Sequence, residues 1–262
     1  MLRLLTAMLL APIAIALTVL LPNVWFALLV GVFFLMGLRE WHQLSGCSCR
    51  VGIVGALLLI SLMLIVYLMP KGLYAVSAFG AAYWLFQIFS LITNPTLVRK
   101  SDTSFVCHST LVLLSAWAAL VLLHQYTAHG PIMTIGFMAA IWAADSVAYF
   151  SGKAFGKNKL APKISPGKTI EGVVGGAIGA VIFAIGFCWF STFISYQMGI
   201  VWSVLILIAA LVSVVGDLYE SRLKRSAGTK DSGSLLPGHG GVLDRIDGLL
   251  AAAPVFVTFF LR

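Results

Sequence analysis

The sequence contains very little charge. Only 10% of its 262 residues are Asp, Glu, Lys or Arg, whereas 60% are hydrophobic; a soluble domain is about one quarter charged and about half apolar. So many apolar side chains exceed what the core of a soluble chain of this length can hide. The low charge also argues against a nucleic-acid-binding chain, although the formal net charge is +8. We therefore expect a polytopic membrane protein that binds lipid bilayer and no nucleic acid.

Cysteines and the common catalytic motifs are also scarce. Two of the four cysteines, Cys47 and Cys49, are too close for a usual disulfide and lack the spacing of a zinc pair, so we expect free thiols. The sequence has no Gly-x-Ser-x-Gly, His-Glu-x-x-His or Cys-x-x-Cys motif. These absences argue against a serine hydrolase of the elbow type, a zinc protease and a dithiol oxidoreductase.

Long stretches without any charged residue indicate where the chain crosses a membrane. They cover residues 4–38, 51–70, 72–98, 103–144 and 172–216, and one spanning helix needs about 20 apolar residues. Proline, glycine and asparagine turn signals divide the chain into nine expected helices, at about 4–20, 24–43, 51–69, 73–93, 105–124, 132–152, 169–193, 199–223 and 242–261. We predict an all-α bundle of about nine transmembrane helices, without strands. It forms one domain over 1–262, with 1–130 mainly a hydrophobic scaffold and 131–262 the catalytic half.

The basic residues are distributed unevenly between the two sides of this bundle. With the N-terminus in the cytoplasm, 15 of the 17 Lys and Arg residues fall on the cytoplasmic side, and only Lys71 and Arg262 fall on the other. Cytoplasmic loops of membrane proteins carry an excess of Lys and Arg. The predicted topology is therefore nine helices with a cytoplasmic N-terminus.

Most acidic residues lie in the second half of the chain. Seven of the nine fall between residues 145 and 247, in two clusters separated by the uncharged stretch 172–216. Both clusters lie on the cytoplasmic side in the predicted topology, so they can meet. Ionisable groups at membrane depth are costly and are functional candidates, which places the expected site here. The alternative is a set of ordinary interfacial anchors and loop charges.

The first cluster joins an acidic residue to a lysine-rich segment. Gly167-Lys168-Thr169 is similar to the end of a phosphate-binding loop, but Pro162 stands where a Walker motif needs a glycine. We expect Ser165, Lys168 and Thr169 to open a helix, whose free N–H groups favour a phosphate. A basic interfacial loop before a capped helix is the alternative, with Asp145 as a structural partner of one lysine. The candidates of this cluster are Asp145, Lys163, Ser165, Lys168 and Thr169.

The second cluster lies between residues 216 and 247. Asp217, Ser221 and Lys224 are spaced four and three apart, which places them on one helix face, and Asp244 and Asp247 share a face of the next helix. Two antiparallel helices could therefore aim Asp217 and Asp244 at one point. Carboxylates suit Mg²⁺, which one or two of them usually hold together with substrate phosphates. Alternatively, the carboxylates of the last helix cap it and pair with Arg245 and Lys224.

A glycine-rich segment connects the two helices of this cluster. Gly240 and Gly241 would let the backbone approach a phosphate closely. His239 between glycines is a candidate general base, although a structural role is the more common one. Farther back, Gly172, Gly175, Gly176 and Gly179 form overlapping small-xxx-small patterns, which predict close helix packing.

The segment from Ser221 to Asp247 resembles the signature of phosphatidate cytidylyltransferases, also called CDP-diacylglycerol synthases. It reads S-R-L-K-R, four residues, then K-D-x-G-x-x-L-P-x-H-G-G-V-x-D-R-I-D, and the segments around Asp145 and Ser165–Gly172 also resemble this family. The resemblance implies a membrane enzyme that converts CTP and phosphatidic acid into CDP-diacylglycerol and pyrophosphate with Mg²⁺. It further implies a bacterial inner-membrane location with the site facing the cytoplasm, and it leaves open whether the enzyme is a homodimer.

The motifs and the resemblance together give each candidate an expected role. The expected Mg²⁺ ligands are Asp217, Asp244 and Asp247. Catalysis is assigned to Asp217, Asp244, Lys168, Lys224 and Arg245. Substrate binding is assigned to Asp145, Lys163, Ser165, Thr169, Ser221, Arg225, Lys230, Asp231, His239, Gly240 and Gly241.

Two other functions fit parts of the sequence. A CDP-alcohol phosphotransferase has a pattern that begins Asp-Gly-x-x-Ala-Arg; Asp247-Gly248-x-x-Ala251 starts that way, but Ala252 replaces the arginine and no aspartate follows. A transporter of an anionic substrate would place charges near the bilayer middle and would show an internal repeat. Here the charges are expected at one face.

Overall fold

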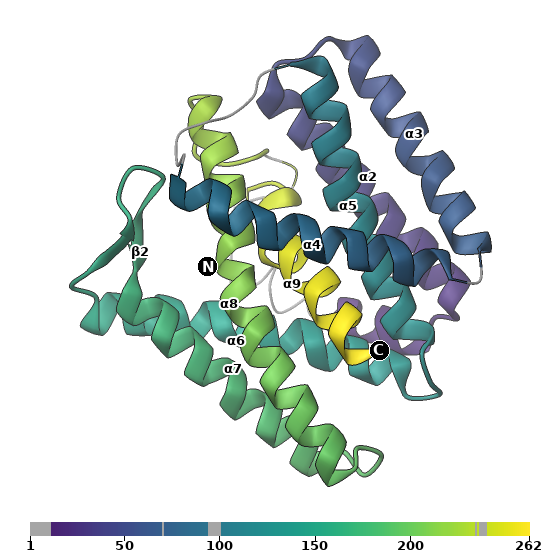
Figure 1. Ribbon diagram of the computed structural model, residues 1–262, viewed down its shortest axis with the longest axis vertical. Coiled ribbons are helices and arrows are strands. Elements are labelled where there is room, and N and C mark those ends of the chain that lie inside the picture. Colours follow the sequence, from purple (N-terminus) through teal and green to yellow (C-terminus); the bar gives the residue numbers. More distant parts are fainter. Residues whose placement is uncertain (1–11, 70, 94–100, 234, 236–239) are drawn as a thin grey trace.

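The computed structural model describes residues 12–69, 71–93, 101–233, 235 and 240–262, and this part of the chain is mostly helical (Figure 1). Residues 12–20 are helical. The long helices that follow are α2 (Asn23–Ser45), α3 (Cys49–Leu68), α4 (Gly72–Thr93), α5 (Asp102–Gln125), α6 (Gly130–Phe155), α7 (Ile170–Phe190), α8 (Tyr196–Ser226) and α9 (Leu243–Phe260).

The predicted membrane class is confirmed. Within the described residues, seven helices, α2 to α8, are long and apolar enough to cross a membrane. The protein is therefore an all-α integral membrane protein in its architecture. The total of nine spans and the side of the N-terminus stay predictions, because residues 4–11 of the first expected helix, 4–20, lie outside the described residues and α9 is not among the seven helices.

Helix α9 occupies the centre of the bundle. All of its residues from Gly248 to Val257 are buried. It packs against α8, α5 and α4, and in Figure 1 it passes behind α4. By contrast, the most apolar 18 residues of α3 and α7 are only 22% and 17% buried within the protein, so these two helices present broad faces to lipid. The helix that carries Asp244 and Asp247 is thus enclosed by protein.

Helices α6 and α7 pack closely through the predicted small residues. A methyl group at Gly176 would lie 2.9 Å from the carbonyl oxygen of Ala144 and 3.0 Å from Cβ of Ala148. A methyl group at Gly172 would similarly lie 3.0 Å from the carbonyl oxygen of Ala148. All three distances are shorter than ordinary van der Waals contact, so the packing role predicted for these glycines is confirmed.

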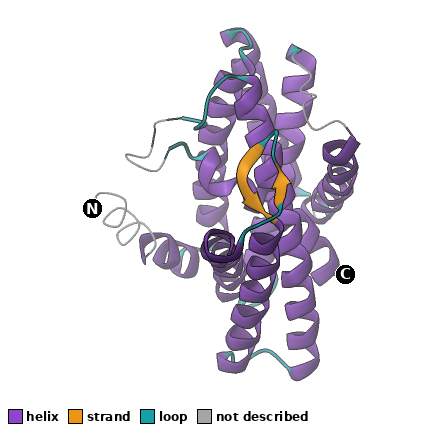
Figure 2. Cartoon of the chain, turned by 90° about the vertical axis from the view of Figure 1, so that its left-hand side faces the viewer, coloured by secondary structure: helices purple, strands orange, loops and turns teal. Residues whose placement is uncertain are grey.

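One segment differs from the sequence prediction, because it forms strands where none was expected. The strands β1 (Lys159–Ala161) and β2 (Ser165–Thr169) make an antiparallel hairpin. Figure 2 shows the hairpin against the helices, and in Figure 1 it projects beyond the adjoining ends of α6 and α7. The hairpin brings Lys168 toward the end of α8 rather than along the axis of α7.

The start of α7 explains this difference. The prediction that Ser165 and Lys168 open a helix is wrong, because both lie on β2 and α7 begins only at Ile170. Pro166 and Gly167 between them are poor helix formers. Thr169 does take part, as the N-cap: its side-chain oxygen accepts a hydrogen bond from the Gly172 amide at 3.1 Å, the usual role of threonine at this position.

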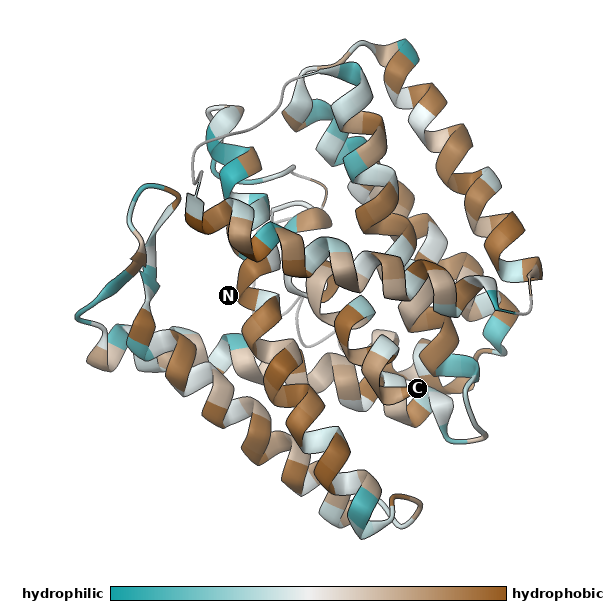
Figure 3. Cartoon of the chain, in the orientation of Figure 1, coloured by the Kyte–Doolittle hydropathy of each residue, from teal (hydrophilic) through white to brown (hydrophobic). Residues whose placement is uncertain are grey.

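Polar residues are concentrated in a few places on this apolar bundle. Figure 3 shows hydrophobic residues along the lengths of the helices and hydrophilic residues on the hairpin and at the end of α8. These two regions contain eight of the 17 candidate residues, four on the hairpin and four on α8.

Candidate active site at the end of α8

Helix α8 carries the central side chains of the candidate site. Two groups of interacting residues meet it. We call Asp145, Lys168, Asp217 and Ser221 the hairpin cluster, and Glu220, Lys224, Ser232, Gly241 and Asp244 the loop cluster. The first joins α8 to β2 and α6, and the second joins α8 to the segment that precedes α9.

The hairpin cluster is centred on Asp217. Lys168 Nζ lies 2.5 Å from Asp217 Oδ2, and the Ser221 hydroxyl donates a hydrogen bond to Asp217 Oδ1 at 3.2 Å. The charges of Asp217 and Lys168 both act on Asp145, which is exposed on α6. The Lys168 and Asp217 side chains are 24% and 34% exposed, so a ligand can reach this ion pair.

The loop cluster is centred on Lys224. Its ammonium group donates to Glu220 Oε2 at 2.6 Å and to Asp244 Oδ1 at 2.7 Å. The side chains of Lys224, Glu220 and Asp244 are only 11%, 3% and 9% exposed. Asp217 and Asp244 therefore each pair with a different lysine.

Asp244 also organises the loop before α9. Its Oδ2 atom accepts hydrogen bonds from the Ser232 amide at 2.9 Å, the Ser232 hydroxyl at 3.0 Å and the Gly241 amide at 2.8 Å. Four donors on one carboxylate match the alternative that Asp244 is a structural carboxylate paired with Lys224. Asp244 can also act as a metal or substrate ligand only if that ligand takes the place of one of these donors.

The glycine at the tip of this loop is needed for its shape. Gly240 has φ 81°, in the region that side-chain-bearing residues rarely adopt. A methyl group there would also lie 2.6 Å from Asp244 Oδ2. The positive φ and the lack of space beside Asp244 both explain why this position is a glycine.

The remaining predicted residues surround these clusters. Arg225 ties α8 to the hairpin, since its Nε donates to the Ile164 carbonyl at 3.3 Å. Asp247 is half-buried and experiences the charges of Asp217, Glu220 and Asp145. Ser165 is half-buried on β2, His239 lies outside the described residues, and four others are exposed: Lys163, Lys230, Asp231 and Arg245.

The acidic side chains have the donor chemistry that Mg²⁺ prefers. Carboxylate oxygens are hard ligands, and Mg²⁺ usually takes only one or two of them together with substrate phosphates. In the part of the chain that the structure describes, no group of three or more His, Cys, Asp or Glu residues is arranged to hold a metal ion. A magnesium site here would therefore need substrate phosphate oxygens beside one or two carboxylates, and Asp217 and Asp247, which influence each other electrostatically, have the oxygen chemistry for it.

Three residues of the site, Glu40, Glu220 and Ser232, were missed by sequence reasoning, and Glu40 is the most distant from the others along the chain. Glu40 on α2 accepts hydrogen bonds from the Val242 and Leu243 amides and from the Ser232 hydroxyl. It lies outside the acidic region of the chain and belongs to none of the motifs. The available signal was an acidic side chain directly after a 35-residue stretch, 4–38, without charge, because such a residue is a functional candidate by position alone.

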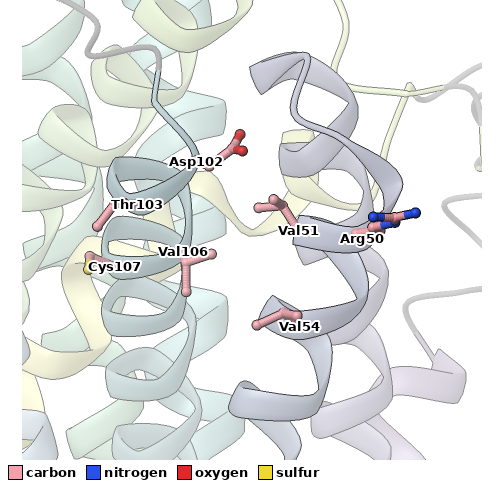
Figure 4. Close-up of a pocket in the computed structure, with 7 residues that line it drawn as sticks. All are labelled: Arg50, Val51, Val54, Asp102, Thr103, Val106 and Cys107. Carbon is pink, nitrogen blue, oxygen red and sulfur yellow. The ribbon is translucent and has the colours of Figure 1, made fainter.

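A surface pocket lies elsewhere in the molecule. Its lining residues all belong to α3 and α5 and include Arg50, Val54 and Asp102 (Figure 4). It is therefore separate from both clusters, which are built from α6, β2, α8, α9 and the segment that precedes α9.

Comparison with known proteins identifies the family. A family model described as the cytidylyltransferase family matches residues 1–261. The chain is 42% identical to a phosphatidate cytidylyltransferase of Pseudomonas aeruginosa over 98% of this chain and 95% of that protein. It is 35% identical to the one of Haemophilus influenzae, over 98% and 97% of the two chains, and 34% identical to the one of Bacillus subtilis, over 88% and 84%. With matches of this extent, the chain belongs to the cytidylyltransferase family.

Proposed function

We propose that this protein is a phosphatidate cytidylyltransferase, which makes CDP-diacylglycerol and pyrophosphate from CTP and phosphatidic acid. One observation carries the proposal. Lys224 and Asp244, both in the segment that resembles the family signature, pair directly between α8 and α9. On the same helix α8, Asp217 pairs with Lys168 of the hairpin, and both side chains are partly exposed.

The arrangement suits two substrates of different character. A lipid enters from the bilayer and a polyanionic nucleotide from water, so the site has to lie where apolar helices end in charged groups. Lys168 can exchange Asp217 for a phosphate oxygen, because both side chains are partly exposed. Charge-assisted hydrogen bonds of this kind are strong, and Arg245 and Lys163, both exposed, supply further positive charge.

We propose Mg²⁺ as the cofactor, with Asp217, Asp244 and Asp247 as its protein ligands. When bound, the ion would neutralise charge on the phosphate oxygens. Asp217, with a side chain 34% exposed, is more accessible than Asp244, with a side chain 9% exposed. Asp244 can take part only by exchanging Lys224, Ser232 or Gly241 for the ion, as its present contacts require.

The proposed reaction is a single in-line displacement. A phosphate oxygen of phosphatidic acid attacks the α-phosphorus of CTP, the bond from this phosphorus to the oxygen bridging to the β-phosphate breaks, and pyrophosphate leaves. A phosphate monoester with a second pKa of about 6 is already largely ionised at neutral pH, so no strong base is needed. The lysines contribute positioning and electrostatic stabilisation.

A covalent route has less support from the site. It would need a nucleophile activated by a neighbouring base. Ser221 does donate to Asp217, but that carboxylate already forms an ion pair with Lys168, so it is not reserved as a base for this hydroxyl. We therefore propose a ternary complex and inversion of configuration at the α-phosphorus.

The test uses purified protein, α-labelled CTP and phosphatidic acid in mixed micelles, with and without Mg²⁺. We expect labelled CDP-diacylglycerol only when protein, CTP, phosphatidic acid and Mg²⁺ are all present. A chiral thiophosphate analogue of CTP should give inversion. Absence of the lipid product would overturn the function, and retention or a labelled protein would overturn the single displacement. A CDP-alcohol phosphotransferase would instead consume CDP-diacylglycerol and ignore CTP.

We further propose that the site faces the cytoplasm from a bacterial inner membrane. The experiment places single cysteines in a cysteine-free background and labels intact cells with an impermeant thiol reagent. Lys71→Cys should label and Lys159→Cys should not, because they fall on opposite sides in the predicted topology. Labelling of Lys159→Cys but not of Lys71→Cys would show that the topology is the reverse of the predicted one.

A further inference from the structure

A buried carboxylate on α2 contacts the segment that precedes α9. Glu40 is only 2% exposed. Its Oε1 atom accepts from the Val242 amide at 2.9 Å, and its Oε2 atom accepts from the Leu243 amide at 2.8 Å and from the Ser232 hydroxyl at 2.9 Å. Each partner lies about two hundred residues away along the chain.

These contacts replace a cap that α9 lacks. The first amides of a helix have no partner within the helix, and the N-cap of α9 is Val242, which has no side-chain hydrogen bond to offer. Carboxylates stabilise helix N-termini through these amides and through the helix dipole. Glu40 therefore caps α9 from another helix, so that the start of α9 is fixed to α2.

The Ser232 hydroxyl connects Glu40 to the loop cluster. It lies 2.9 Å from Glu40 Oε2 and 3.0 Å from Asp244 Oδ2. A hydroxyl has one hydrogen, so it donates to one carboxylate at a time and sits between two negative charges. A methyl group at Gly233 would lie 2.7 Å from Glu40 Oε1, so the loop wraps tightly around this carboxylate.

We infer that Glu40 is a positioning residue for the proposed cytidylyl transfer. It holds the Ser232 and Gly241–Leu243 ends of the signature loop in the conformation that places Asp244 and Gly240, and it acts through the loop without touching substrate. The expected effect on kinetics rests on the proposed function. The anchoring of the first amides of α9 by Glu40 does not depend on that function.

The first test measures loop anchoring without any activity. Glu40→Gln replaces one acceptor oxygen by an NH₂ group facing donors, so the amides of Val242 and Leu243 should lose protection from hydrogen exchange. We expect at least about tenfold faster exchange, since hydrogen bonds to charged groups contribute about one to two powers of ten in such equilibria. Thr134→Val is the matched control: it removes a fully buried hydroxyl that bonds only within α6, to the Gly130 carbonyl. Unchanged exchange in Glu40→Gln would overturn the inference.

The second test separates positioning from simple loss of stability. Glu40→Gln should raise KM for CTP about tenfold and leave KM for phosphatidic acid within about twofold, as expected for a loop contact worth one power of ten. Glu40→Asp, which keeps the charge, should restore part of the loss, and Thr134→Val should change neither KM. Equal KM changes for both substrates, or the same profile in Thr134→Val, would contradict a positioning role.

Ser232→Ala gives a milder variant in case Glu40→Gln folds poorly. It removes only the bridging hydroxyl, and combined with Glu40→Gln it should cost less than the sum of the two single effects on KM for CTP, because both act through one loop. Strict additivity would contradict the connection through Ser232. If the wild-type protein makes no CDP-diacylglycerol, the proposed function fails, and the exchange measurement still decides whether Glu40 anchors the loop.

Discussion

The two clusters on α8 use the same chemistry in different environments. Lys168 and Asp217 form an ion pair with side chains 24% and 34% exposed, whereas Lys224 and Asp244 form one with side chains 11% and 9% exposed. An exposed pair contributes little to stability and exchanges partners readily. A buried pair is costly to break, because removing one partner leaves an uncompensated charge. The comparison indicates that the hairpin cluster is arranged to meet ligands and the loop cluster to hold the site in shape.

Their positions in the fold account for this contrast. Lys168 lies on a hairpin that projects beyond the helices (Figure 1). Lys224 lies between α8 and the start of α9, with Glu220 one turn earlier on its own helix and Asp244 on the other. The burial of α9 among its neighbours thus decides which lysine is structural.

The largest expected effect comes from breaking the buried pair. Lys224→Met leaves Glu220 and Asp244 buried without their cation, and we expect a loss of about 3–5 kcal/mol of unfolding free energy, the usual cost of breaking a buried pair. Thermal unfolding in detergent micelles measures it. Lys163→Met, at an exposed position of the hairpin turn, is the control and should unfold like the wild type. If the Lys224 variant were as stable as that control, the buried ion pairs of Lys224 would contribute no more to stability than an exposed pair does.

The second prediction separates the two aspartates. Asp217→Asn should lower turnover about hundredfold or more, the effect of losing one charged stabilising group, with little change in stability because its carboxylate is partly exposed. Asp244→Asn should lower both turnover and the unfolding temperature, since it loses the pairing with Lys224. Turnover at limiting Mg²⁺ and thermal unfolding distinguish them. Wild-type turnover in Asp217→Asn would exclude it as a required ligand.

The third prediction concerns the glycine of the loop. Gly240→Ala must hold a positive φ and crowd Asp244 Oδ2, and the left-handed conformation costs about 1–2 kcal/mol. We expect turnover about tenfold lower, corresponding to that energy. Gly167→Ala is the matched control, because a methyl group at Gly167 meets nothing within 4 Å. Equal effects in both variants would mean that the loop conformation is not specifically required.

The smallest expected effect is on the exposed pair. Lys168→Ala should raise KM for CTP several-fold, by removing one phosphate contact worth about 1–2 kcal/mol, and should leave the unfolding temperature unchanged. Steady-state kinetics with CTP and phosphatidic acid varied separately provide the measurement. A large fall in stability would show that Lys168 is structural and would remove the contrast between the clusters.

Much of the architecture could be predicted because it depends on local properties. Apolar stretches of sufficient length must form helices in a membrane, where every backbone group needs a partner, and their bounds follow turn signals within a few residues. Helix periodicity likewise placed Asp217 and Ser221 close together, and they share a hydrogen bond. The hairpin was missed because strands of three and five residues show too little alternation of polar and apolar residues to be recognised.

The sequence alone determined the membrane class, the helix-forming segments and the set of charged residues from which the site is built. Only the tertiary structure decided which lysine pairs with which aspartate, and that Glu40 caps α9 across 202 residues of chain. The physical reason is that hydropathy and periodicity act over one helix turn or one helix length. Ion pairs and inter-helix caps depend on how separate helices are brought together, and on the burial that this packing creates.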